Sequence, residues 1–162
     1  MTRCYSKLVG LLGLLPSVAF ADMAKEGTFD FISCYSATYT VTKFSDTHSL
    51  VSYENTGIVR SAVPDGPFDK DTFHCIGVEL VVDKKVANDT TLCESMDKDG
   101  NKRLSRYSNN DGKITREQLG GTGKYDGLTM TLNAIESLGP FPRIKAGTSQ
   151  NCNHQKGTYK LK

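Results

Sequence analysis

Four polar side chains in the first half of the sequence are of types that move protons in enzymes. Glu54, His74 and Glu79 lie in stretches rich in β-branched and aromatic residues, and Tyr53 precedes the first of them. A carboxyl or imidazole group in apolar surroundings can acquire the shifted pKa that general acid/base catalysis uses. Solvent-facing glutamates and a purely structural histidine are the competing interpretation. Hydrolase-type nucleophilic catalysis is not predicted, because the sequence has no G-x-S-x-G motif.

Three tyrosines and one histidine are the candidate ligand-binding residues. Tyr35, Tyr39 and Tyr53 share one phase of alternating sequence, and His74 falls on the apolar phase of another stretch. Tyrosine combines apolar ring surface with a hydroxyl group, so these rings can line a pocket for a hydrophobic or amphipathic molecule. The alternative is that the aromatic rings fill the interior of a small barrel and leave no pocket.

Three loop sequences resemble ion or phosphate sites but lack essential residues. Residues 97–101 and 109–114 resemble the centre of a calcium-binding EF-hand loop, yet neither has carboxylates at the first and last loop positions. Residues 120–124, Gly-Gly-Thr-Gly-Lys, are glycine-rich like a phosphate-binding loop, but the Walker spacing is missing. We therefore predict hairpin turns at the acidic loops, with no metal site and no cofactor.

The first 21 residues have the pattern of a secretory signal peptide. A basic start and an apolar run over residues 8–15 are followed by Ala-Phe-Ala, which ends at Ala21. The apolar run is shorter than the roughly 20 residues that cross a bilayer. We therefore predict cleavage near Ala21, no membrane span, and a periplasmic or secreted product comprising residues 22–162.

Composition favours one globular domain in residues 22–162. The sequence has 20 basic and 18 acidic residues, and loss of the two basic residues in the signal peptide makes these counts equal. A neutral chain is a poor candidate for nucleic-acid binding, so no nucleic-acid partner is predicted. Charge is uneven, however, because residues 137–162 contain five basic residues and no acidic one. This segment favours either a solvated face or a surface for an anionic partner such as lipid headgroups.

Four cysteines remain after cleavage: Cys34, Cys75, Cys93 and Cys152. In an oxidising compartment an even number predicts two disulfides, for which the sequence allows three pairings. We favour Cys75 with Cys93, which flank two neighbouring strands, and Cys34 with Cys152, which would fasten the first strand to the last. Zinc is the competing interpretation, but no C-x-x-C pair supports it.

Alternation with a period of two residues predicts an all-β chain. Asp-Gly pairs at the expected turns support hairpins, and no segment shows a capped helical pattern. The expected strands are residues 29–42, 50–59, 73–82, 90–96, 102–108, 113–118, 127–136 and 152–161. Eight short strands favour a single closed antiparallel barrel, which leaves no exposed sheet edge. An outer-membrane barrel is the alternative, but the polar residues expected outside do not form an apolar band.

Residues 120–129, Gly-Gly-Thr-Gly-Lys-Tyr-Asp-Gly-Leu-Thr, resemble the G-G-T-G-K-[FY]-x-G-[IL]-T segment of allene oxide cyclase and dirigent barrels. Small exported bacterial proteins of that superfamily are also similar in residues 21–27, 73–77 and 156–160. The resemblance implies a flattened, calycin-like barrel of eight antiparallel strands with an interior cavity, in a family that is often oligomeric. It implies no catalytic residue in this sequence.

Three functions follow from these observations as hypotheses. The first is a non-enzymatic exported barrel that binds a small hydrophobic or amphipathic ligand, with a homo-oligomer left open. The second is an isomerase or cyclase that acts on a hydrophobic substrate through Tyr53, Glu54, His74 and Glu79. The third is an envelope structural or interaction protein that uses the basic residues Arg143 and Lys145.

Overall fold

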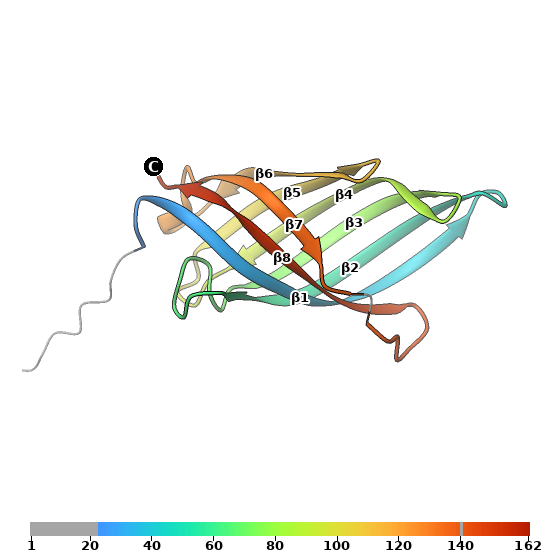
Figure 1. Ribbon diagram of the computed structural model, residues 1–162, viewed down its shortest axis with the longest axis horizontal. Helices are drawn as coiled ribbons and strands as arrows, with labels where there is room; N and C mark the ends of the chain where they lie inside the picture. Colours follow the sequence, from blue (N-terminus) through green and yellow to red (C-terminus); the bar gives the residue numbers. More distant parts are fainter. Residues whose placement is uncertain (1–22, 140) are drawn as a thin grey trace, which may run out of the picture.

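The computed structural model describes residues 23–139 and 141–162, which form one antiparallel β-sheet rolled into a barrel (Figure 1). In chain order the elements are β1 (Glu26–Lys43), β2 (His48–Ser61), β3 (Thr72–Val82), β4 (Lys85–Met96), β5 (Lys102–Asn110), β6 (Lys113–Gly121), the 3₁₀ helix η1 (Gly123–Tyr125), β7 (Thr129–Ser137) and β8 (Thr148–Lys160). Eight strands in the described residues confirm the predicted all-β barrel.

The strands lie in the order β6-β5-β4-β3-β2-β1-β8-β7. Strand β1, with 18 residues, pairs with β8 over Glu26–Thr38 and with β2 over Phe31–Lys43, so the two ends of the barrel domain meet in the sheet. The barrel closes where β6 approaches β7, but no ladder of hydrogen bonds joins these two strands in the described part of the chain. The barrel is therefore nearly closed.

Two disulfides join directly opposed residues of neighbouring strands. Cys34 on β1 is bonded to Cys152 on β8, and Cys75 on β3 is bonded to Cys93 on β4. Both predicted pairings are confirmed. Disulfides persist in oxidising compartments, so they indicate a non-cytoplasmic environment. The predicted signal peptide lies outside the described residues, and no helix within those residues is long and apolar enough to span a membrane.

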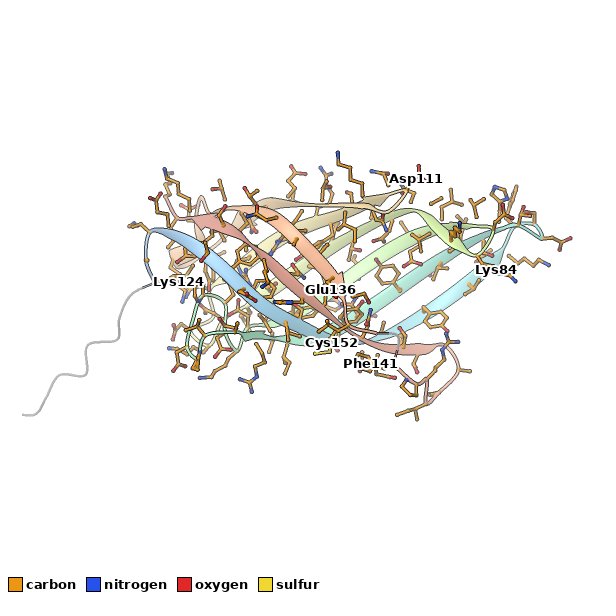
Figure 2. All side chains as sticks on the ribbon, in the orientation of Figure 1. Lys84, Asp111, Lys124, Glu136, Phe141 and Cys152 are labelled. Atoms are coloured by element: carbon orange, nitrogen blue, oxygen red, sulfur yellow. A yellow bond between two sulfur atoms is a disulfide. The ribbon has the colours of Figure 1, made fainter. Side chains whose placement is uncertain are left out.

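Apolar and aromatic side chains fill the barrel at one end, which we call the closed end. The loop between β2 and β3, the turn between β4 and β5, and η1 lie there. Buried residues of this core include Phe29, Phe31, Val59, Phe68, Tyr125, Leu128, Met130, Tyr159 and Leu161. The opposite, open end carries the turns β1–β2, β3–β4 and β5–β6 and the loop between β7 and β8 (Figure 1). Figure 2 marks the two ends with Lys124 at the closed end and Lys84 at the open end.

Tyr125 plugs the closed end, and the glycine-rich segment before it makes this placement sterically feasible. The Tyr125 side chain packs 6.0 Å from Phe68, centroid to centroid, and only 1% of the residue is exposed. A Cβ atom at Gly121 would collide with the backbone carbonyl of Tyr125. Gly123 has a positive φ of 57°, a conformation that favours glycine. Residues 120–125 therefore have a structural role in which a bulky side chain closes the barrel.

Candidate functional site

A cavity of about 550 Å³ occupies the barrel between the closed-end core and the open end. Side chains from the inner face of the strands line the cavity. On β1 every second residue does so: Phe31, Ser33, Tyr35, Ala37, Tyr39 and Val41. This volume lies in the range of small-molecule sites. The barrel is therefore hollow over the part where aromatic filling was the competing expectation.

Tyrosine rings form one wall of the cavity. Tyr35 and Tyr39 come from β1 and Tyr53 comes from β2, and all three line the cavity. Tyr53 lies opposite Gly77, where a Cβ atom would collide with the phenol ring. Glycine at position 77 therefore lets the Tyr53 ring approach the backbone of β3 closely. The inward phase predicted for the tyrosines is present, and ligand binding by these residues remains a prediction.

Two carboxylates face each other beside Tyr53. Glu79 on β3 is directly opposite Asp89 on β4, and both line the cavity. The Tyr53 hydroxyl donates a hydrogen bond of 2.6 Å to Oδ1 of Asp89 and also contacts Oγ1 of Thr91. Burial raises the pKa of Glu79, and the neighbouring Asp89 charge raises it further. Burial also raises the pKa of Asp89, against the opposing effect of the hydrogen bonds from Tyr53 and Thr91.

Strands β5, β6 and β8 contribute a second polar group to the cavity. Nη2 of Arg116 donates a 3.2 Å hydrogen bond to Oγ of Ser105, and the guanidinium lies 5.2 Å from the centroid of the Tyr107 ring. The Tyr107 hydroxyl donates a 3.2 Å hydrogen bond to Oε1 of the buried Gln155. Burial lowers the pKa of Arg116. The cavity thus has acidic and basic groups on different strands.

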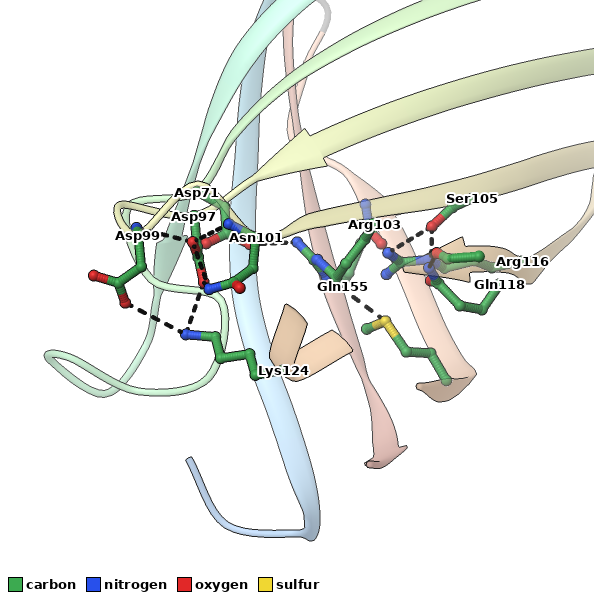
Figure 3. Close-up of polar contacts among 12 residues, drawn as sticks. Asp71, Asp97, Asp99, Asn101, Arg103, Ser105, Arg116, Gln118, Lys124 and Gln155 are labelled. Atoms are coloured by element: carbon green, nitrogen blue, oxygen red, sulfur yellow. Dashed lines mark hydrogen bonds and ion pairs between the residues drawn. The ribbon is translucent and has the colours of Figure 1, made fainter. Parts of the chain in front are cut away.

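A buried ion pair lies where the cavity lining meets the closed-end core, and Figure 3 shows its two side chains. Arg103 on β5 pairs through Nη2 with Oδ2 of Asp71, and both side chains are almost fully buried. The Arg103 guanidinium also lies 4.1 Å from the centroid of the Phe68 ring. Burial raises the pKa of Asp71 to about 6, against the opposing charge of Arg103. This pair holds Arg103 at the inner end of the cavity, whose lining it joins.

The structure corrects the predicted position of His74. The inner phase of β3 is Phe73, Cys75 and Glu79, so His74 lies on the outer face and does not line the cavity. There its Nε2 lies 2.7 Å from Oε1 of Glu54, which is also outside the barrel. The prediction took the apolar phase of residues 73–82 as the inner one. Instead, the buried Cys75–Cys93 disulfide occupies the inner face, and two apolar residues of the other phase, Ile76 and Val78, are exposed.

The acidic turn before β5 stabilises its own loop and the closed end. Asp97 accepts hydrogen bonds of 2.9 Å from the backbone N–H groups of Asp99 and Asn101, and its Oδ2 lies 2.7 Å from Nζ of Lys124. Burial alone would raise the pKa of Asp97, but the bonds from Lys124 and Asn101 outweigh it and lower the value to about 2. No group of three or more metal-ligating side chains occurs among residues 23–139 and 141–162.

The basic residues near the end of the chain have different environments. Nζ of Lys156 lies 3.0 Å from Oδ2 of Asp30, and Nζ of Lys160 lies 3.9 Å from Oε2 of Glu26. Arg143, in the loop between β7 and β8, lies 5.6 Å from the centroid of the Tyr39 ring and lines the cavity. The two lysines therefore pair with acidic residues of β1, whereas Arg143 belongs to the open end of the cavity.

Sequence reasoning missed Asp89, Arg103, Tyr107 and Arg116 as cavity residues. Asp89 fell just before the expected strand at residues 90–96, although β4 begins at Lys85. The other three lie on strands that were predicted, and strand alternation could have identified their phase once one inward residue was known. The sequence of one strand does not show which of its two alternating sets of residues faces the barrel interior, because that depends on the neighbouring strands.

The fold and the site together define an all-β barrel with a polar and aromatic interior cavity next to a filled, capped end. The chain matches no family model, and comparisons with curated proteins and with solved structures find no match either.

Proposed function

We propose that this protein is an exported barrel that binds a small hydrophobic or amphipathic molecule in its cavity without transforming it. The observation that carries this proposal is the cavity of about 550 Å³, which has a tyrosine wall and is flanked by a core that needs no ligand to be filled. Pockets of this kind combine apolar surface with a few placed polar groups. Tyr35, Tyr39 and Tyr53 supply both components.

The absence of tryptophan from the sequence allows a direct binding test. A Tyr39→Trp variant places a single tryptophan, excited selectively beyond tyrosine absorption, in the cavity wall, and a Thr38→Trp variant places one on the outer face of the same strand. Titration with 1-decanol should shift the emission of the Tyr39→Trp variant to shorter wavelengths and protect it from acrylamide. The Thr38→Trp variant should not respond. No saturable change in the Tyr39→Trp variant, or an equal change in both, would contradict the proposal.

The proposed location is the periplasm or the medium, reached through cleavage after Ala21. The two disulfides support export, because such bonds persist in oxidising compartments. Mass spectrometry of the protein recovered from the cell envelope or medium should give a first residue of Asp22. Protein that retains residues 1–21 in those fractions would contradict this part of the proposal.

A second candidate function is acid/base catalysis, favoured by the facing carboxylates Glu79 and Asp89 and the adjacent Tyr53 hydroxyl. A carboxyl group with a raised pKa can protonate a substrate in an apolar cavity. This function would be an isomerase or cyclase activity on a hydrophobic substrate. It requires a turnover that the Glu79→Gln and Asp89→Asn variants lose while ligand affinity is kept. A turnover unchanged in both variants would rule out this role.

A further inference from the structure

Arg116 carries a charge for which the cavity provides no carboxylate partner. Its Nη2 donates to Oγ of Ser105, a neutral acceptor, at 3.2 Å. Its Nε and Nη1 atoms are shielded from solvent and have no hydrogen-bond partner in the described part of the chain. A shielded donor without a partner costs about 1 to 3 kcal/mol, and more if it is charged. The folded chain therefore keeps an unsatisfied cationic group against the cavity.

Arg103, the other arginine at this end of the cavity, differs from Arg116 in having a counter-ion. Arg103 has Asp71 as its counter-ion, and both residues are buried. Even so, the Nε atom of Arg103 has no partner among the described residues. Figure 3 shows Arg103 between Asp71 and Arg116. Asp71 pairs with Arg103, so Arg116 is left without a counter-ion among the described residues. Buried charges in folded proteins are normally paired.

The cavity carboxylates do not supply that pair. In the strand register, Arg116 shares a row with Tyr107, Thr91 and Gly77. The row of Glu79 and Asp89 lies two residues further toward the open end. Within residues 23–139 and 141–162, neither carboxylate forms an ion pair with an arginine or a lysine. The interior is therefore polarised, with excess positive charge beside β5 and β6 and negative charge beside β3 and β4, while Arg143 lines the open end.

Building on the proposed ligand-binding function, we infer that the natural ligand is an organic anion whose carboxylate-like group pairs with the guanidinium of Arg116. The Tyr107 ring lies beside the Arg116 guanidinium and its hydroxyl donates to Gln155, and all three residues line the cavity. The apolar part of the ligand lies against Tyr35, Tyr39 and Tyr53. Glu79 and Asp89 repel a second anionic group, so a monoanion is preferred to a dianion.

Two fluorescent probes with the same ring system test this inference. 1-Anilinonaphthalene-8-sulfonate carries one anionic group, and N-phenyl-1-naphthylamine is the same molecule without it. The wild-type protein should bind the sulfonate at least tenfold more tightly, because charge-assisted hydrogen bonds add roughly this much. The Arg116→Gln variant should lose this preference but keep its affinity for the neutral probe. An Arg116→Lys variant, which retains the charge without the planar fork, should keep part of the preference.

The matched control is Arg106→Gln on the same sheet. Arg106 lies on the outer face of β5 and pairs with Glu117, so its loss should leave both affinities unchanged. Equal wild-type affinities for the two probes would overturn the anion inference but leave the proposed binding function standing. Binding of neither probe to the wild-type protein would overturn both. A preference for the sulfonate that survives in the Arg116→Gln variant would assign the anion to another site.

Discussion

The two halves of this barrel use the same strands for different purposes. At the closed end, inward residues such as Phe29, Phe31 and Tyr159 pack into a core, and Tyr125 completes it. Further along β1, the inward residues Tyr35 and Tyr39 line a cavity instead. The alternation is unbroken between the two halves, so the backbone does not distinguish them. The difference comes from what fills the inner positions of the facing strands.

The two halves also differ in how their charged side chains are paired. At the closed end, each buried carboxylate has a cationic partner: Asp71 pairs with Arg103, and Asp97 pairs with Lys124. In the cavity, Glu79 faces another carboxylate, and Arg116 has no carboxylate partner among the described residues. Pairing lowers the cost of burying charge, whereas unpaired groups retain that cost. The closed end thus pairs its buried charges, whereas the cavity retains charged groups without an oppositely charged partner among the described residues.

The largest change in the free energy of unfolding should come from removing the Tyr125 side chain, which closes the barrel. Tyr125→Ala should lower the free energy of unfolding by about 3 to 5 kcal/mol, because it deletes a buried aromatic side chain. Tyr39→Ala in the cavity wall should cost about 1 kcal/mol or less, because the half-buried ring borders open space. Urea denaturation followed by circular dichroism measures both changes. Equal losses would show that the two halves are not energetically distinct.

The next effect concerns a paired carboxylate and depends on pH. The pKa of Asp97 is about 2 in the folded protein, against an ordinary value of 3.8, so ionisation of this group favours folding. Asp97→Asn should therefore cost about 2 kcal/mol at pH 7. The contribution is fully present above about pH 4 and is lost as the pH falls toward about 2.

Urea midpoints of the Asp97→Asn variant and the wild-type protein, measured between pH 7 and pH 3, give the test. The two curves should converge as the solution becomes acidic. Asp99→Asn is the matched control in the same turn, because Asp99 is half exposed and lies 3.9 Å from Nζ of Lys124. Its effect should stay below about 0.5 kcal/mol. A pH-independent loss in the Asp97→Asn variant would assign its role to shape rather than charge.

Local patterns in the sequence were enough to predict most of the barrel. Alternation gave eight strands, and the spacing of cysteines on neighbouring and terminal strands predicted both disulfides. These features depend on short-range periodicity, which each strand carries by itself. The inward phase of the three tyrosines was accessible for the same reason, since their strands bury aromatic residues on one face only.

The charged residues of the cavity could not be predicted in this way. His74 was placed on the wrong face because β3 exposes Ile76 and Val78 and turns Glu79 inward, which reverses the usual rule for apolar residues. The opposition of Glu79 and Asp89 is a property of the β3–β4 register. Nothing in the sequence indicates that two guanidinium nitrogens of Arg116 have no hydrogen-bond partner among the described residues. Such features depend on contacts between strands, which periodicity does not encode.

The smallest expected effect on the free energy of unfolding is a gain rather than a loss. Glu79→Gln should raise the free energy of unfolding by about 0.5 kcal/mol at pH 7, because it removes a like charge directly opposite Asp89. Burial raises the pKa of Glu79 above its ordinary value of 4.5, so its ionisation favours the unfolded chain. The gain should therefore disappear as the pH falls below about 4, where the carboxyl group is protonated in both states.

Glu54→Gln provides the control for this gain, since it removes the same charge from the outer face, where Glu54 contacts His74. That variant should show no gain at pH 7. Differential scanning calorimetry of both variants at pH 7 and pH 4 separates the cases. A gain confined to Glu79→Gln would show that the cavity carboxylates reduce stability, as expected of groups retained for binding. A loss in Glu79→Gln would mean that the carboxylate has a favourable partner in the folded barrel, and the division between a stabilising end and a binding end would fail.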